Sequence, residues 1–191
     1  STEIRIGPYI TSEIINEGGM ARIYRARSVN SKIDVALKVS ANGISNGSAL
    51  RKEADLLLRL QNDGIIKITP IPLEQSRQPL YMARATNFPE SPWYYVMEYL
   101  KGGNLAMIPN QERIPLNLVS SISIKVAKTL IYIHSKGIAH LDIKLENIML
   151  KEPLANNKSA EPILIDFGVA AQIKQARGTG GTLITMAPEY L

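Results

Sequence analysis

The sequence contains no cysteine, and this absence excludes two kinds of structure. Without a thiol the chain can form neither a disulfide bond nor a metal site with thiolate ligands. Histidine is also scarce, because His134 and His140 are the only two in 191 residues. A histidine-rich metal site is therefore not expected either.

Aromatic residues make up only 6% of the chain, and they are not interleaved with basic residues as in a stacking platform for single-stranded nucleic acid. The 22 Lys and Arg residues exceed the 17 Asp and Glu residues, which gives a formal net charge of +5, but they are scattered rather than gathered in a dense run. A basic protein favours anionic ligands, which include nucleotides, nucleic acids and anionic membranes. Because the chain has neither a dense run of basic residues nor an aromatic stacking platform, we do not expect nucleic-acid binding.

No apolar run approaches the roughly 18 residues of a membrane-spanning helix, and the chain does not open on a signal-peptide pattern. We therefore expect a cytoplasmic protein with no membrane segment in this chain. Apolar residues make up 45% of the sequence, which is within the ordinary globular range. A chain of 191 residues is long enough for a core in one domain or in two small lobes.

The segment 140–147 (HLDIKLEN) combines side chains that handle the phosphates of a nucleotide. Asp142 can accept a hydroxyl proton, Lys144 can neutralise a transferring phosphoryl group, and Asn147 can ligate a divalent ion. Residues of these types also meet in turns that cap their own backbone, so the segment alone leaves a structural role open. It resembles the catalytic loop H-R-D-x-K-x-x-N of the eukaryotic-like protein kinases.

A second segment, 15–26 (INEGGMARIYRA), predicts a hairpin of two strands around a pair of glycines. At a tip with so little side-chain bulk, backbone N–H groups can approach phosphate oxygens closely. The segment resembles the kinase glycine-rich loop G-x-G-x-x-G-x-V, and its Gly-Gly-Met core is similar to bacterial members. Gly18 falls on a motif glycine, whereas Asn16 and Ala21 stand at the other two positions. A Gly-Gly hairpin without a ligand is the alternative.

Lys38 ends an apolar strand, 35–38 (VALK), and resembles the V-A-I-K lysine that holds the α- and β-phosphates. Alternatively, it faces water on an edge strand. A helix is predicted over 49–60, capped by Ser48, and it places Glu53 on the same stripe as its leucines. Because an acid on an apolar stripe is costly without a partner, we expect Glu53 to pair with Lys38.

The strand predicted over 93–100 (WYYVMEYL) runs into a Gly-Gly pair and resembles the kinase hinge. The resemblance implies that Met97 is the gatekeeper and that the backbones of Glu98 and Leu100 face the adenine. A strand followed by a turn is the plain structural interpretation. The resemblance also implies nucleotide contacts from Ile15, Gly18, Gly19, Ile23, Ala36 and Met149. The Pro-rich stretch 65–95 is longer than the family's usual region, and we assign it no role.

The second half predicts a core helix over 116–135, between Pro115 and Gly137. After it, Asp166 leaves a buried strand and is followed by Phe-Gly, which resembles the D-F-G motif. The resemblance implies that Asp166 bridges magnesium to the phosphates. An A-P-E sequence follows at 187–189. Thr179 before it is a candidate phosphosite, and Thr182 resembles the threonine that braces the catalytic Asp and Lys in Ser/Thr kinases.

These motifs occur in kinase order over nearly the whole chain, which is identified as a member of the eukaryotic-like Ser/Thr protein kinases. The resemblance implies an α+β, bilobal fold with a β-rich N-lobe over 1–100 and an incomplete helical C-lobe over 101–191. It implies transfer of a phosphoryl group from ATP, with Mg²⁺, to Ser/Thr hydroxyls of a protein substrate. The catalytic residues would be Asp142, Lys144, Lys38 and Glu53, with Asn147 and Asp166 as metal ligands.

Two departures modify this interpretation. Leu141 stands where most regulated kinases carry arginine, so we expect activity without phosphorylation of the activation segment. The chain also stops two residues after Glu189, before the helices that complete a kinase C-lobe. We expect either a truncated domain, or an oligomer or partner chain that covers the exposed apolar surface. A pseudokinase scaffold and a small-molecule kinase of the aminoglycoside type are the rival functions.

Overall fold

A computed structural model describes residues 4–41, 47–72, 78–88, 90–108, 114–154 and 160–172. The chain divides into two compact units. The first unit consists of residues 1–59 and 67–99, and the second unit consists of residues 60–66 and 100–191. The lobe boundary at residue 100 stays a prediction. The A-P-E sequence, Thr179 and Thr182 lie outside the described residues.

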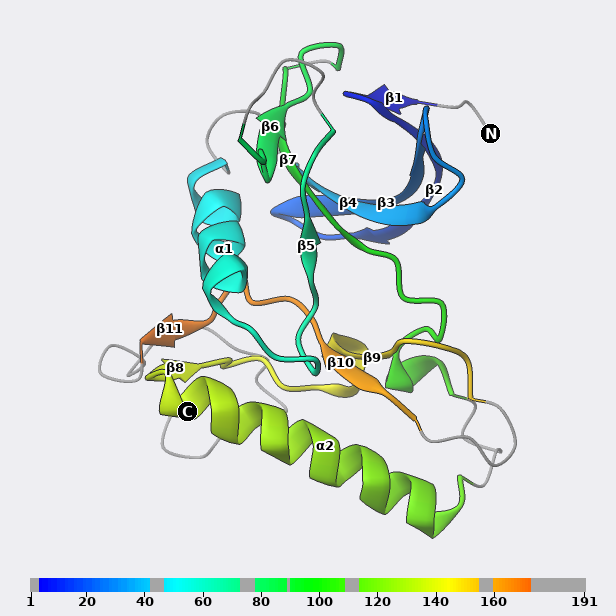
Figure 1. The fold of residues 1–191 in the computed structure, drawn as a ribbon, viewed down its shortest axis with the longest axis vertical. Helices are drawn as coiled ribbons and strands as arrows, with labels where there is room; N and C mark the ends of the chain where they lie inside the picture. Colours follow the sequence, from blue (N-terminus) through cyan, green and yellow to red (C-terminus); the bar gives the residue numbers. More distant parts are fainter. Residues whose placement is uncertain are drawn as a thin grey trace. The chain divides into compact units, whose positions relative to one another are not determined.

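The first unit is built on a curled antiparallel sheet (Figure 1). Its strands are β1 (Arg5–Ile6), β2 (Tyr9–Glu17), β3 (Ala21–Ser28), β4 (Asp34–Ser40), β5 (Ile68–Thr69), β6 (Met82–Arg84) and β7 (Trp93–Glu98). They are hydrogen-bonded in the order β1-β2-β3-β4-β7-β5, and β6 also pairs with β7. Two irregularities interrupt the β2–β3 register, after Thr11 and after Ile14. Such bulges increase the local twist, which agrees with the curl of the sheet.

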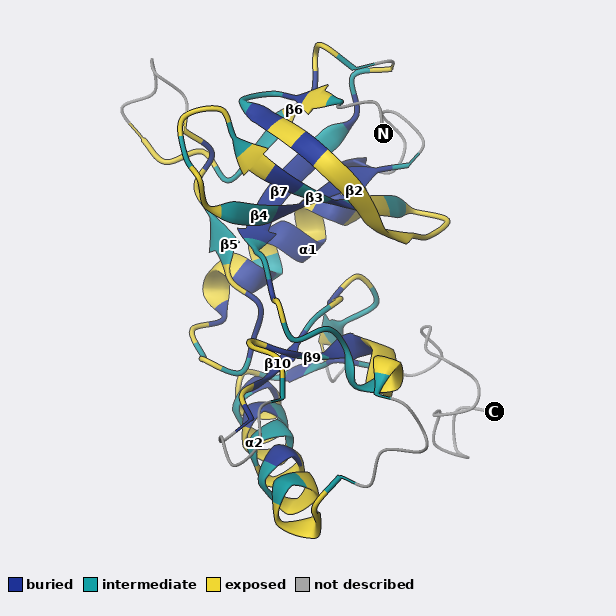
Figure 2. Ribbon diagram, turned by 90° about the vertical axis from the view of Figure 1, so that its right-hand side faces the viewer, coloured by how far each residue is buried: buried dark blue, intermediate teal, exposed yellow. Residues whose placement is uncertain are grey.

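Alternation along the strands separates the sheet into two faces. One face forms a core of ten buried residues: Ile6, Tyr9, Tyr24, Ala26, Leu37, Val39, Ile71, Ala85, Tyr94 and Val96. The opposite face carries Ile23, which pairs with Lys38, and Ala36, which pairs with Met97. Buried residues are concentrated in β4 and β7, the central strands (Figure 2). Four of the predicted site residues therefore lie on the face opposite this core: Ile23, Ala36, Lys38 and Met97.

The helix α1 (Gly47–Arg59) packs against β5 and β7. It begins two residues earlier than the sequence predicted, so the expected cap at Ser48 is wrong, because Ser48 lies inside the helix. A Cβ atom at Gly47 would collide with the indole ring of Trp93. The missing side chain thus allows the first turn to lie against this ring. The predicted stripe is confirmed, since Glu53 and Leu57 are both buried.

The second unit is built around α2 (Leu116–Ser135), whose bounds match the prediction. Two short antiparallel pairs accompany it, β9 (Ile148–Leu150) with β10 (Pro162–Leu164) and β8 (Ile138–Ala139) with β11 (Ala171–Gln172). Two 3₁₀ turns complete the unit, η1 (Leu105–Met107) and η2 (Leu145–Asn147). Ile122, Leu150 and Ala160 form a small core against one side of α2.

Several apolar side chains are exposed on the rest of α2. Leu116, Ile124 and Ile131 are 80%, 55% and 68% exposed. Contrary to the sequence-based expectation, α2 is long and apolar enough to cross a membrane by length and composition. The expectation was based on unbroken apolar runs. In this helix serines and two lysines interrupt the apolar residues, but the helix is still apolar on average. Core helices of soluble proteins meet the same criterion of length and composition. That a partner chain or an oligomer covers the exposed apolar residues of α2 stays a prediction.

Candidate functional site

In the first unit, Lys38 and Glu53 form a buried ion pair. The Nζ atom of Lys38 lies 2.8 Å from both carboxylate oxygens of Glu53. The two side chains are only 11% and 4% exposed. Lys38 comes from β4 in the sheet, and Glu53 comes from the buried stripe of α1. The predicted pairing is therefore present, and it ties the helix to the sheet through two desolvated charges.

The predicted phosphate-binding hairpin joins β2 to β3. The N–H group of Gly18 donates to the carbonyl of Ala21 at 2.9 Å, and this bond closes the turn. A Cβ atom at Gly19 would meet nothing within 4 Å, and one at Gly18 would meet only the Ala21 carbonyl at 3.6 Å. Neither glycine adopts a positive φ angle. Packing and backbone geometry therefore do not require these glycines, whereas close approach of an anionic ligand would.

The predicted hinge begins at the end of β7. Met97 is buried and lies opposite Ala36 in β4 and Ile68 in β5. Glu98 is held by Lys67 twice: its N–H donates to the Lys67 carbonyl at 3.1 Å, and its carboxylate accepts from the Lys67 N–H at 3.0 Å. Ile15, the remaining predicted contact on β2, is 42% exposed. The strand end is thus fixed from one side by backbone and side-chain hydrogen bonds.

In the second unit, two predicted catalytic residues and one predicted metal ligand converge within the segment 140–147. Asn147 donates from Nδ2 to the carboxylate Oδ2 of Asp142 at 2.8 Å and to its backbone carbonyl at 2.9 Å. Lys144 lies with Nζ at 2.9 Å from the same Oδ2 atom. Hydrogen bonding to Asp142 raises the pKa of Lys144, so this lysine stays charged at neutral pH. The Asp142 side chain, 12% exposed, is therefore held by an amide and a cation.

His140, which the sequence analysis did not assign to the site, connects these residues to the next strand. Its Nδ1 atom accepts from the N–H of Asp142 at 3.3 Å, so Nε2 carries the hydrogen that reaches the Ile165 carbonyl at 3.0 Å. The ring also packs edge-on against Phe167, with centroids 4.6 Å apart. The position of His140 two residues before Asp142 is the one sequence feature that could have indicated this role. The sequence does not show that both ring nitrogens form hydrogen bonds.

The predicted metal ligands are connected through the backbone. The N–H of Ile165 donates to the Asn147 carbonyl at 3.0 Å, which places the residue before Asp166 beside Asn147. Asn147 is buried, and its Oδ1 atom accepts no hydrogen bond among the described residues. An amide oxygen and a carboxylate suit magnesium, which takes oxygen ligands and keeps several waters. The residues present therefore fit the ion.

Backbone strain also concentrates here. Leu141 and Asp166 have φ angles of 65° and 60°, in the left-handed region that non-glycine residues rarely adopt. The other two such residues in the described parts of the chain, Glu90 and Ser91, belong to a loop of the first unit. Strained residues persist where the surrounding structure holds them, and they cluster at functional sites. Their positions support a functional role for both segments.

We predict that the second unit loses stability as the pH falls below about 6.5. Burial lowers the pKa of His140 below its usual value of 6.5, since the neutral ring is favoured in the folded state. The unfolded chain then binds a proton that the folded chain excludes, so stability is complete above pH 6.5 and declines on acidification. Denaturant unfolding between pH 7.5 and 5.5 measures this. The decline should persist in His134→Gln, the exposed histidine, and should vanish in His140→Gln.

Comparison with known proteins agrees with this geometry. A family model described as the protein kinase domain matches residues 9–191. A probable serine/threonine-protein kinase of Dictyostelium discoideum is 31% identical over 195 residues, which cover 97% of this chain and 27% of the relative. Receptor-interacting serine/threonine-protein kinase 1 of Homo sapiens is 25% identical over 204 residues, covering 99% and 28%. A probable serine/threonine-protein kinase of Clostridium perfringens is 28% identical over 167 residues, covering 85% and 21%.

The chain thus spans less than a third of the length of these relatives. The family match confirms the expected α+β fold of the protein kinases and the interpretation of the motif order. The relatives include a bacterial protein, as the glycine hairpin suggested. The chain belongs to the protein kinase family and, within it, to the eukaryotic-like serine/threonine kinases.

Proposed function

We propose that the protein transfers a phosphoryl group from ATP to Ser or Thr hydroxyls of a protein substrate. The observation that carries the proposal is the arrangement around Asp142, whose carboxylate is fixed by Asn147 at 2.8 Å and Lys144 at 2.9 Å. Such an oriented carboxylate can accept the proton of an attacking hydroxyl. The neighbouring ammonium group can stabilise charge on the transferring phosphoryl group.

In this proposal, the first unit binds the nucleotide. Lys38, oriented by Glu53, neutralises the phosphates, and the bare backbone of Gly18 and Gly19 lets N–H groups approach their oxygens. Ile23, Ala36 and Met97 supply an apolar surface for the base on one face of the sheet. The remaining predicted contacts are Ile15 and Glu98 in this unit and Leu100 and Met149 in the second unit.

In the second unit, Asn147 and Asp166 would hold magnesium. When bound, this ion neutralises phosphate oxygens and helps to orient the nucleotide. His140 keeps the two ends of this site together, because it bonds to both Asp142 and Ile165. Asp142 then orients and deprotonates the substrate hydroxyl. Lys144 attracts the phosphoryl group that this hydroxyl receives.

The protein substrate and the cytoplasmic setting belong to the same proposal. The names of the relatives as serine/threonine-protein kinases support a protein rather than a small alcohol as the acceptor. The alternative is a scaffold that binds a nucleotide or a partner protein. Such a scaffold has the same fold but does not catalyse phosphoryl transfer. Transfer from radiolabelled ATP to a casein-like protein distinguishes the two, and labelling of a small alcohol instead would favour the small-molecule kinase.

The test is a thermal shift with ATP and Mg²⁺ on the wild-type chain and on Asp166→Ala. A ligand at 100 times its dissociation constant should stabilise the folded chain by about 2.7 kcal/mol. We expect a magnesium-dependent shift in the wild type that is lost in the variant. Glu152→Gln, an exposed acid in a surface turn, is the control and should behave as the wild type. No shift in the wild type would refute the nucleotide site.

A further inference from the structure

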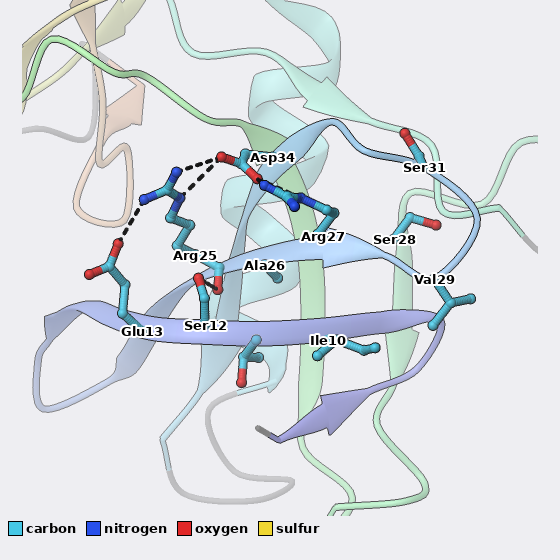
Figure 3. Close-up of a pocket in the computed structure, with 11 residues that line it drawn as sticks. Ile10, Ser12, Glu13, Arg25, Ala26, Arg27, Ser28, Val29, Ser31 and Asp34 are labelled. Atoms are coloured by element: carbon cyan, nitrogen blue, oxygen red, sulfur yellow. Dashed lines mark hydrogen bonds and ion pairs between the residues drawn. The ribbon is translucent and has the colours of Figure 1, made fainter. Parts of the chain in front are cut away.

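A cluster of four charged side chains lies on the β2–β3–β4 part of the sheet, beyond the residues discussed so far. Asp34, the first residue of β4, accepts from two arginines of β3 (Figure 3). Its Oδ2 atom accepts from Nε and NH2 of Arg25 at 3.2 and 2.6 Å. Its Oδ1 atom accepts from Nε and NH2 of Arg27 at 2.9 and 2.7 Å. Both carboxylate oxygens are thus occupied by guanidinium groups.

Arg25 is fixed on its other side as well. Its NH1 atom lies 3.1 Å from a carboxylate oxygen of Glu13 in β2. Three nitrogen atoms of the guanidinium are therefore engaged, and the plane of the group is determined. The cluster is exposed at its edge, where it lines a cavity of about 640 Å³ (Figure 3). The hydrogen bonds from Arg25 and Arg27 lower the pKa of Asp34, so this carboxylate is charged at neutral pH.

The flat face of this fixed guanidinium meets Tyr99. The Arg25 carbon Cζ lies 4.7 Å from the centre of the Tyr99 ring, within the range of a cation–π contact. Tyr99 directly follows β7 and stands between Glu98 and Leu100, whose backbones the proposed function assigns to the adenine. Lys67 holds Glu98 by two hydrogen bonds, and Arg25 holds Tyr99. Two separate contacts therefore restrain the exit of β7.

The register shows where this contact lies relative to the proposed nucleotide surface. Arg25 pairs with Ala36, and Ala36 pairs with Met97. Residues opposite one another in an antiparallel sheet share a face, so Arg25 lies on the same face as the predicted base contacts. A shift of Tyr99 would change the backbone that follows β7 without touching the phosphate-binding residues.

We infer that Arg25, held by Asp34 and Glu13, is a positioning residue that fixes Tyr99 and thereby the backbone that binds the base. The inference rests on the proposed nucleotide site and adds to it the residues that set its affinity for the base. Arg27 supports Asp34 from the other side and has no contact with Tyr99 among those the structure describes. Asp34 and Glu13 lie outside the kinase motifs found in the sequence, whereas Arg25 belongs to the segment of the glycine hairpin and Tyr99 to the predicted hinge strand.

The experiment measures binding of ATP with Mg²⁺ and of adenosine to the full 191-residue chain by titration calorimetry. Adenosine lacks phosphates, so its affinity reports on the base end alone. We expect Tyr99→Leu and Asp34→Asn to weaken both ligands by the same factor, about threefold to tenfold. Tyr99→Phe keeps the ring and should bind as the wild type. The double variant Asp34→Asn/Tyr99→Leu should bind no more weakly than Tyr99→Leu, because both substitutions disrupt the same contact between Arg25 and Tyr99.

Glu161→Gln is the matched control, because it removes a carboxylate from an exposed ion pair with Lys151 in the second unit. Unchanged adenosine affinity in folded Tyr99→Leu overturns the inference, even if Asp34→Asn fails to fold. A loss for ATP without a loss for adenosine also overturns it, since the effect would then lie at the phosphates. The inference is also overturned if the wild type binds ATP but does not bind adenosine. If the wild type binds neither ligand, the proposed function fails and the inference fails with it.

Discussion

Glu53→Gln is expected to lower the free energy of unfolding of the first unit by about 3–5 kcal/mol. The Glu53 side chain is 4% exposed, and the Lys38 ammonium that it contacts through both oxygens is 11% exposed. An amide keeps the shape of the carboxylate but not its charge, so the buried lysine loses the carboxylate that lies 2.8 Å from it. Because burial of an uncompensated charge is costly, most of the loss should come from desolvated Lys38.

Urea unfolding followed by circular dichroism measures the loss. Glu17→Gln is a matched control, because Glu17 and Arg22 form a pair of similar length, 2.7 Å, with both side chains about half exposed. Solvent screens such a pair, so the control should leave the unfolding midpoint unchanged. A Glu53→Gln variant as stable as the control would show that the pair is not desolvated in solution.

The double variant Lys38→Met/Glu53→Leu separates stability from function. Two apolar side chains of similar volume need no partner, so the double variant should recover most of the stability lost in Glu53→Gln. Binding of ATP should not recover, because the cation assigned to the phosphates is gone. Recovery of both would remove Lys38 from the proposed site. Recovery of stability alone would indicate that the ion pair serves the ligand rather than the fold.

The Lys38–Glu53 pair could be predicted from the sequence because its signal is local. The spacing of Glu53 and Leu57 placed an acid on a buried stripe, and the cost of an unpaired buried charge required a partner. The bounds of α2 were predictable for a similar reason, since Pro115 and Gly137 flank a regular apolar period. The start of α1 was not, because it depends on Gly47 meeting Trp93 from a distant strand.

The roles of His140 and Arg25 could not be predicted because they depend on contacts between separate segments. The bond from His140 to Ile165 spans 25 residues, and no periodicity connects them. Arg25 reaches Tyr99 only after the strands have paired, and the sequence shows it as one of many scattered basic residues. The two-residue pairing of β8 with β11 also lies below the length at which alternation can be recognised.

Asp142→Asn is expected to reduce the rate of phosphoryl transfer about 10²- to 10⁴-fold, the range that a positioned general base contributes. The substitution keeps the volume of the side chain, and the backbone carbonyl of Asp142 can still accept from Asn147. Amide oxygen does not take a proton from a hydroxyl, so the chemical step should fail while the loop keeps its shape. ADP release from ATP in the presence of a protein substrate gives the rate.

Glu146→Gln is the matched control, because it removes the same charge from an exposed residue four positions later. Its rate should stay within about twofold of the wild type, which would exclude a general effect of loop charge. Binding of ATP with Mg²⁺ should be retained in Asp142→Asn, since the proposed ligands of the ion are Asn147 and Asp166. An Asp142→Asn variant that keeps more than a tenth of the wild-type rate would assign proton transfer to another group. A variant that binds no nucleotide would instead show that Asp142 organises the site, because the loss would then precede chemistry.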